Sequence, residues 1–128
     1  MNKYSFVGSL TAILSARMYV ALGGPLNYSI LGYQLHHFYY GVSLFVVVGI
    51  FKRIKVSESL IYFVVGVALG FISDEIDLLL SFGRPYTLQL YNVPLNLAAD
   101  IALVLVLYRL SLSPDYSHGF LLGVERSI

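Results

Sequence analysis

The stretch that decides the predicted fold is residues 59–80, which read SLIYFVVGVALGFISDEIDLLL. Its first part is almost entirely apolar, and a helix that crosses the hydrocarbon core of a membrane needs about 20 largely apolar residues. Asp74, Glu75 and Asp77 stand together near its end. The stretch therefore predicts a transmembrane helix that carries ionisable side chains close to one of its ends.

Three further apolar stretches lie at residues 4–23, 36–51 and 94–112, and the second of these has an alternative start near residue 31. Pro94 suits the first turn of a helix, where a missing N–H costs nothing. The chain is 58% hydrophobic and 12% charged over 128 residues, whereas a soluble domain is typically about 25% charged. We therefore predict an all-α integral membrane bundle of four transmembrane helices in residues 1–112, followed by a short cytoplasmic tail at 113–128.

The basic residues predict the direction of this bundle. Short loops rich in Lys and Arg stay on the cytoplasmic side. Most of the basic residues fall on one side of a four-helix weave, namely Lys3, Lys52, Arg53, Lys55, Arg109 and Arg126. Both termini are therefore expected inside, in a multi-pass protein of the cell membrane or a viral envelope. The first stretch alternatively predicts a cleaved signal peptide, although Arg17 interrupts it.

Ionisable residues gather in the predicted outer half of the bundle. The first and fourth helices carry Arg17 and Asp100, and the second and third carry His36, His37, Asp74, Glu75 and Asp77. Charged groups inside a membrane cost about 2.5–3.5 kcal/mol each, so they usually face the bundle interior or a water-filled cavity. The pattern predicts that these side chains converge on one polar site.

Helix geometry ranks the carboxylates of the third stretch. At about 100° per residue, Gly66, Gly70, Asp74 and Asp77 share one face. Gly66 and Gly70 form a GxxxG pair, which allows another helix to approach closely. Glu75 points away from this face unless the helix unwinds just before it. Asp74 and Asp77 are therefore preferred to Glu75 as site residues.

Imidazole and carboxylate groups together are ligands for Zn, Fe or Mn. The candidate metal ligands are His36, His37, Asp74, Asp77 and Glu75. A metal with a vacant position would activate water for hydrolysis. The spacing is not that of a HExxH motif, and two adjacent histidines cannot point the same way in a regular helix. A divalent metal is thus the candidate cofactor.

Arg17 and Asp100 are the candidate catalytic residues. In a metal-dependent enzyme Asp100 would act as a base or support the metal, and Arg17 would hold an anionic headgroup. The plainer interpretation is a polar network, in which Arg17 neutralises Asp74 or Asp100 and the histidines bind water. The sequence leaves the two interpretations open.

Residues 36–41 (HHFYYG), 66–70 (GVALG) and 74–75 (DE) form a pattern. It resembles one in small archaeal polytopic membrane proteins of no established activity. The resemblance covers less than half of the chain. It implies that the His pair and the Asp–Glu pair belong to one arrangement. The absence of Cys and Trp and the many Tyr residues would suit a thermophilic archaeon or one of its viruses.

The leading hypothesis is a multi-pass membrane protein with a polar, candidate metal-binding site. Three alternatives stay open: a metal-dependent enzyme for a lipid or lipid-linked substrate, a structural subunit of a membrane complex or viral envelope, and a component of a proton or ion pathway. The expected partners are the lipid bilayer and either a second copy or a membrane-complex subunit. A net charge of +1 gives no bulk attraction to nucleic acid.

Overall fold

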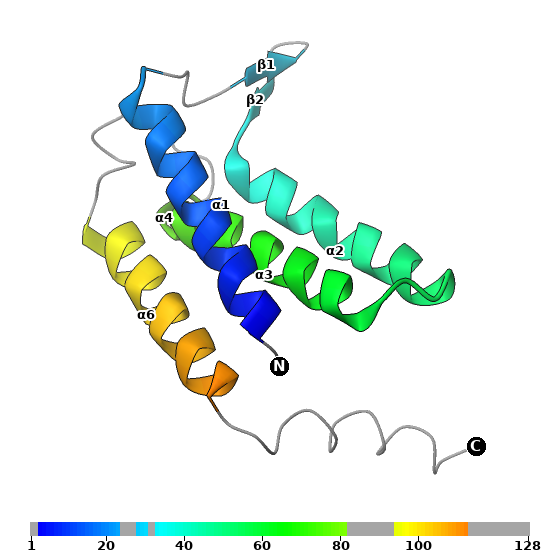
Figure 1. The fold of residues 1–128 in the computed structure, drawn as a ribbon. Coiled ribbons are helices and arrows are strands. Elements are labelled where there is room, and N and C mark those ends of the chain that lie inside the picture. The colour runs from blue at the N-terminus through cyan, green and yellow to red at the C-terminus, as the bar shows by residue number, and fades with distance from the viewer. Residues whose placement is uncertain (1–2, 24–27, 31–32, 82–93, 113–128) are drawn as a thin grey trace.

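The computed structural model describes residues 3–23, 28–30, 33–81 and 94–112, which are mainly helical (Figure 1). In chain order the elements are α1 (Lys3–Ala21), β1 (Tyr28–Ile30), β2 (Tyr33–Leu35), α2 (His37–Arg53), α3 (Glu58–Asp74), α4 (Ile76–Ser81) and α6 (Pro94–Ser111). The helical fold agrees with the sequence prediction. The hairpin of β1 and β2 was not predicted.

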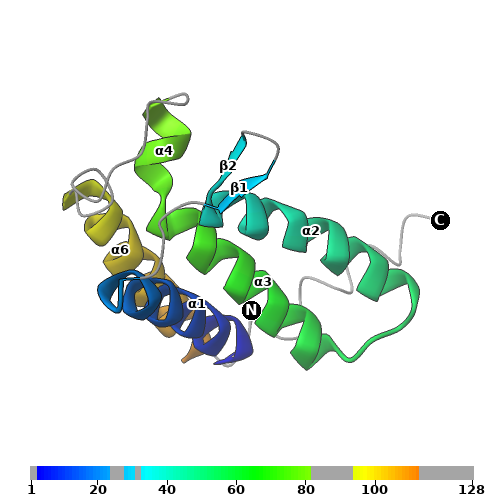
Figure 2. The same ribbon diagram turned by 90° about the horizontal axis from the view of Figure 1, so that it is seen from above.

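Helix α3 lies at the centre of the arrangement. It packs against α1 and α6 on one side and against α2 on the other (Figure 2). Its sequence explains this position, because Gly66, Ala68, Gly70 and Ser73 are all buried and small. Small side chains allow neighbouring backbones to approach closely, so one helix can contact three others.

The contact between α1 and α3 is a backbone contact. A Cβ atom added at Gly66 would collide with the backbone of Ser5, and one added at Gly8 would collide with the carbonyl of Phe63. At Gly70 the added atom would lie 2.7 Å from the carbonyl oxygen of Ser9. The close approach predicted from Gly66 and Gly70 is therefore present, and α1 is the helix that makes it.

Helix α2 meets α3 through Gly41. A Cβ atom there would lie 2.6 Å from the Ala68 carbonyl oxygen and 2.8 Å from the side chain of Ile72. The helix begins at His37, directly after the antiparallel hairpin, in which Tyr28 pairs with Leu35. This connection places the first residues of α2 beside the last residues of α3.

The prediction of four transmembrane helices with both termini inside is wrong, and so is the multi-pass location in a cell membrane or viral envelope. In the part of the chain that the structure describes, one helix, Pro94–Ser111, is long and apolar enough to cross a membrane. The third apolar stretch does not form one long helix, because α3 ends at Asp74 and α4 starts at Ile76. Helices α2 and α3 are each 17 residues long.

The predicted tail at 113–128 falls outside the described residues, so its cytoplasmic assignment stays a prediction. The ends of the described helices differ only slightly from the predicted ranges. The exception is the break after Asp74, which divides the third stretch and brings a different set of side chains inward.

Candidate functional site

A cluster of ionisable side chains is buried where α1, α2, α3 and α6 meet. We define the ionisable cluster as Arg17, His36, His37, Asp74, Glu75 and Asp100. Asp74 and Glu75 are fully buried, and Asp100 is 3% exposed. Charged side chains are almost never fully buried unless they are paired. The predicted convergence of ionisable residues from separate helices is therefore present.

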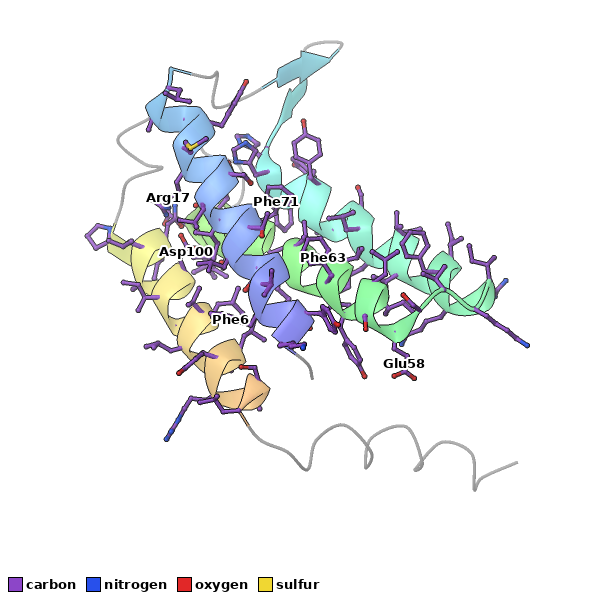
Figure 3. All side chains as sticks on the ribbon, in the orientation of Figure 1. Phe6, Arg17, Glu58, Phe63, Phe71 and Asp100 are labelled. Carbon is purple, nitrogen blue, oxygen red and sulfur yellow. The ribbon has the colours of Figure 1, made fainter. Side chains whose placement is uncertain are left out.

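Arg17 joins two carboxylates from different helices. Its Nε lies 3.0 Å from Asp74 Oδ1, and its Nη2 lies 2.8 Å from Asp100 Oδ2. Figure 3 shows Arg17 and Asp100 facing each other between α1 and α6. The hydroxyl of Ser73 donates to Asp100 Oδ1 at 2.7 Å. The predicted neutralisation of Asp74 or Asp100 is thus a double ion pair that fastens three helices together.

The break between α3 and α4 turns Glu75 into the cluster. Glu75 has φ −125° and ψ 35°, which lies outside the helical region, and its side chain therefore leaves the direction that a continuous helix would give it. Its Oε2 accepts a hydrogen bond from the backbone N–H of Phe38 in α2 at 2.9 Å. Glu75 therefore does not point away from the cluster as a continuous helix would require. From the sequence, this position of Glu75 was expected only if the helix unwinds near this point, and the structure shows that it does.

Asp77 lies in α4, beyond the break, and does not join the cluster. Its backbone N–H donates to Asn96 Oδ1 at 2.9 Å. Asn96 is fully buried and stands one helical turn before Asp100 on the same face of α6. Sequence reasoning gave Asn96 no role, although this four-residue spacing from Asp100 was the signal that links it to the cluster.

Both histidines approach Glu75. Nδ1 of His36 lies 3.9 Å from Glu75 Oε1, and Nδ1 of His37 lies 3.8 Å from the same oxygen. His36 has extended backbone (φ −96°, ψ 156°) and precedes the first helical residue, His37. Two adjacent side chains therefore approach one carboxylate, an arrangement that two residues of one regular helix could not reach.

His37 stands between two carboxylates. Its Nδ1 lies 3.8 Å from Asp74 Oδ2 as well as from Glu75 Oε1. The interaction with Asp74, assisted by the charge of Glu75, raises the pKa of His37 against the opposing effect of burial. Burial lowers the pKa of His36, and the neighbouring His37 adds to this effect. Of the two histidines, His37 is the one that favours the protonated form.

Burial raises the pKa of the Glu75 carboxyl to about 7, although the N–H of Phe38 favours the charged form. Glu75 therefore changes protonation state near neutral pH, and the raised pKa of His37 favours its protonated form. Their facing atoms, Glu75 Oε1 and His37 Nδ1, are buried and accept or donate no hydrogen bond within the described residues. This pair is the part of the cluster whose state a change of pH alters most directly.

The charges of the cluster do not balance without protons. Asp74, Glu75 and Asp100 are three potential negative charges, whereas Arg17 supplies one permanent positive charge. An uncompensated charge in a buried site costs several kcal/mol, so such groups neutralise or acquire partners. One proton on either His37 or Glu75 leaves one negative charge in excess, and protons on both complete the balance.

The geometry adds no support for the predicted divalent metal. Among the described residues, no group of three or more His, Cys, Asp or Glu side chains could hold a metal ion. Zinc ligands lie about 2.0–2.2 Å from the metal and enclose it. The candidate ligand set of His36, His37, Asp74, Asp77 and Glu75 loses Asp77 in any case, and the metal stays a prediction.

A pocket of about 290 Å³ opens between α1 and α6 beside the cluster. Aliphatic side chains line most of it, and Arg17 and Asp100 are also part of its lining. The Arg17 side chain is 24% exposed, in contrast to the carboxylates it binds. The carboxylates of the cluster are thus buried, and the cluster reaches the pocket through Arg17.

Comparison with known proteins gives no relative for this chain. No family model, no curated protein and no solved structure matches it. The resemblance to small archaeal membrane proteins therefore stays a prediction. Its one implication, that the His pair and the Asp–Glu pair belong to one arrangement, agrees with the distances of His36 and His37 from Glu75.

Proposed function

We propose that this protein takes up and releases a proton at the buried pair of His37 and Glu75, and that the proton controls how α2 is held against the rest of the fold. The observation that carries the proposal is the position of His37 Nδ1, 3.8 Å from both Asp74 Oδ2 and Glu75 Oε1. An imidazole between two buried carboxylates binds its proton more tightly than an isolated one does.

The charge balance supports the same proposal. Arg17 is shared by Asp74 and Asp100, so Glu75 has no permanent cation of its own among the contacts described above. When His37 and Glu75 are considered together, one proton between them leaves the pair neutral. Loss of that proton leaves a buried carboxylate beside the other two, which is the unfavourable state.

The link from the proton to α2 is the hydrogen bond at Phe38. The first N–H groups of a helix have no partner within the helix, and the preceding residue, His36, makes no capping hydrogen bond with its side chain. Glu75 supplies the acceptor from another element at 2.9 Å. A carboxylate near a helix N-terminus is favourable by about 0.3–1 kcal/mol, so protonation of Glu75 weakens the hold on α2.

The test is a pH titration of the histidine side chains by ¹⁵N NMR on the full chain. We expect His37 to titrate above the ordinary value of about 6.5 and His36 to titrate below it. Glu75→Gln removes one of the two carboxylates, so the His37 midpoint should fall in that variant. Glu58→Gln is the matched control, because Glu58 is exposed at the other end of α3 (Figure 3).

A cluster that only fastens the helices predicts a different outcome. In that case His37 would titrate at or below 6.5. The Glu75→Gln and Glu58→Gln variants would then show the same titration midpoint for His37. Amide shifts around Phe38 provide the second readout. They should follow the same pH midpoint as His37 if the proton controls the start of α2, and they should not move with pH if it does not.

A further inference from the structure

The outward face of α2 is apolar and exposed. Exposed aliphatic side chains recur every four residues along it, and their exposed fractions are 45% for Val42, 67% for Val46, 53% for Ile50 and 64% for Ile54. The opposite face, with Gly41 and Val48, is buried. Residues four apart lie one above another on a helix, so these side chains form one continuous stripe.

Basic side chains lie at the same end of α2 as Ile50 and Ile54, with Arg53 on the side of the stripe and Lys52 on the opposite face of the helix. Lys52 and Arg53 lie in the last turn of α2, Lys55 follows in the turn to α3, and all three are exposed. Cations near a helix C-terminus are favoured by the helix dipole, which accounts for Lys52 and Arg53. The dipole does not explain Lys55, which lies beyond the helix with φ 55°, or the apolar side chains beside the basic group.

Charge decides between the two partners that an apolar face could contact. In a symmetric contact the same patch meets itself. Helix α2 contains no acidic residue, so a contact of α2 with α2 of a second copy would supply no opposite charge for the basic group. An anionic lipid surface instead supplies phosphates for the basic side chains and an apolar layer for the neighbouring isoleucines. Each Lys or Arg near such a surface increases the binding constant about fivefold.

We propose that the end of α2 docks on an anionic lipid surface, with Ile50 and Ile54 in the apolar layer and Lys52, Arg53 and Lys55 at the headgroups. The docking end lies at the Glu58 end of α3, whereas Arg17 and Asp100 lie at the other end (Figure 3). The surface and the ionisable cluster are thus separate features. The docking proposal does not depend on the proton site.

The test uses the full chain and two kinds of vesicle, one of phosphatidylcholine alone and one that also contains phosphatidylserine. We expect binding to the anionic vesicles to be at least about tenfold tighter, and to weaken at about 1 M salt, where charges more than about 3 Å apart are screened. The triple variant Lys52→Gln, Arg53→Gln, Lys55→Gln should lose at least about tenfold in affinity for the anionic vesicles.

The double variant Ile50→Ser, Ile54→Ser should weaken binding to the anionic vesicles while leaving the salt dependence in place, because it removes only the apolar part of the contact. Equal binding to both vesicles by the parent protein and the triple variant would overturn the proposal. So would self-association through this face, seen as a dimer in the absence of lipid that the double variant abolishes. The His37 titration of the triple variant should match the parent, which separates failure here from failure of the proton site.

Discussion

Replacement of Glu75 by Gln gives the sharpest test of the cluster, because the change removes a charge while keeping the size of the side chain and an oxygen that can accept the Phe38 N–H. In the folded protein the pKa of Glu75 is raised to about 7 from its ordinary value of 4.5, mainly by burial. The folded state therefore binds this proton more tightly than the unfolded chain does. The stability that the proton contributes is complete below about pH 4.5 and is lost as the pH rises through about 7.

The size of the effect follows from the two pKa values. One unit corresponds to about 1.4 kcal/mol, so the rise from 4.5 to about 7 amounts to about 3 kcal/mol at most. The parent protein should lose up to this amount of unfolding free energy between about pH 5 and about pH 8 through Glu75. The Gln variant has no such proton to lose. The two proteins should be similar at the lower pH, and the variant should be the more stable at the higher pH.

Urea unfolding of both proteins across this pH range, followed by circular dichroism, measures the difference. Glu58→Gln is again the control, because an exposed carboxylate should leave the pH dependence of the parent unchanged. The reasoning would be refuted if the unfolding free energies of the parent and the Glu75→Gln variant ran parallel from about pH 5 to about pH 8. Parallel curves would mean that Glu75 is ionised in the folded protein over the whole range.

Two further predictions concern the contacts that hold the helices together. Arg17→Gln leaves Asp74 and Asp100 buried without their shared cation, and breaking a buried ion pair in this way costs about 3–5 kcal/mol of unfolding free energy. Adding Asp100→Asn should recover part of this free energy. If the double variant recovers none of it, the pairing of these charges is not the cause of the loss. Gly66→Ala should destabilise the fold, because the new methyl group meets the backbone of α1. The methyl group of Gly49→Ala meets no atom within 4 Å, so this control variant should stabilise α2 by up to about 1 kcal/mol. Thermal unfolding measures both variants, and equal changes in their unfolding temperatures would contradict the helix contact at Gly66.

The sequence was sufficient to predict most of the residues that gather in the cluster, but not the exchange of Asp77 for Glu75. Arg17, His36, His37, Asp74 and Asp100 lie near one end of their apolar stretches, and buried ionisable groups must find partners. The close contact at Gly66 and Gly70 was also predictable, because small residues at a four-residue spacing allow one helix to approach another. These predictions need only the helical period and the cost of burying a charge.

The position of Glu75 could not be predicted in the same way. A helical period assigns directions only while the helix continues, and nothing in the local sequence between Ile72 and Asp77 breaks a helix, since it contains no Gly or Pro. The break is stabilised by contacts with other elements, notably Phe38 N–H to Glu75 and Asp77 N–H to Asn96. These partners are distant in sequence, so only the folded structure reveals the break.

The same break explains one part of the wrong count of transmembrane helices, namely the prediction of a single span at residues 59–80. Residues 59–80 were treated as one apolar stretch because their composition permits it, but the chain changes direction at Glu75. Hydropathy averages over a window and does not register a change of direction inside it. The break at Glu75 therefore accounts both for the shorter third helix and for the position of Glu75 against α2.

Glu75 performs two tasks whose requirements conflict. As the acceptor for the first turn of α2 it is most effective when charged, because an anion is favoured at a helix N-terminus. As a fully buried carboxyl beside Asp74 it is driven toward the neutral form. A group under only one of these influences would stay charged or stay neutral across the physiological range. The two influences oppose each other, and the pKa of Glu75 falls at about 7. With His37 Nδ1 3.8 Å from Glu75 Oε1, this balance is the basis of the proposed effect of pH on the contact between α2 and α3.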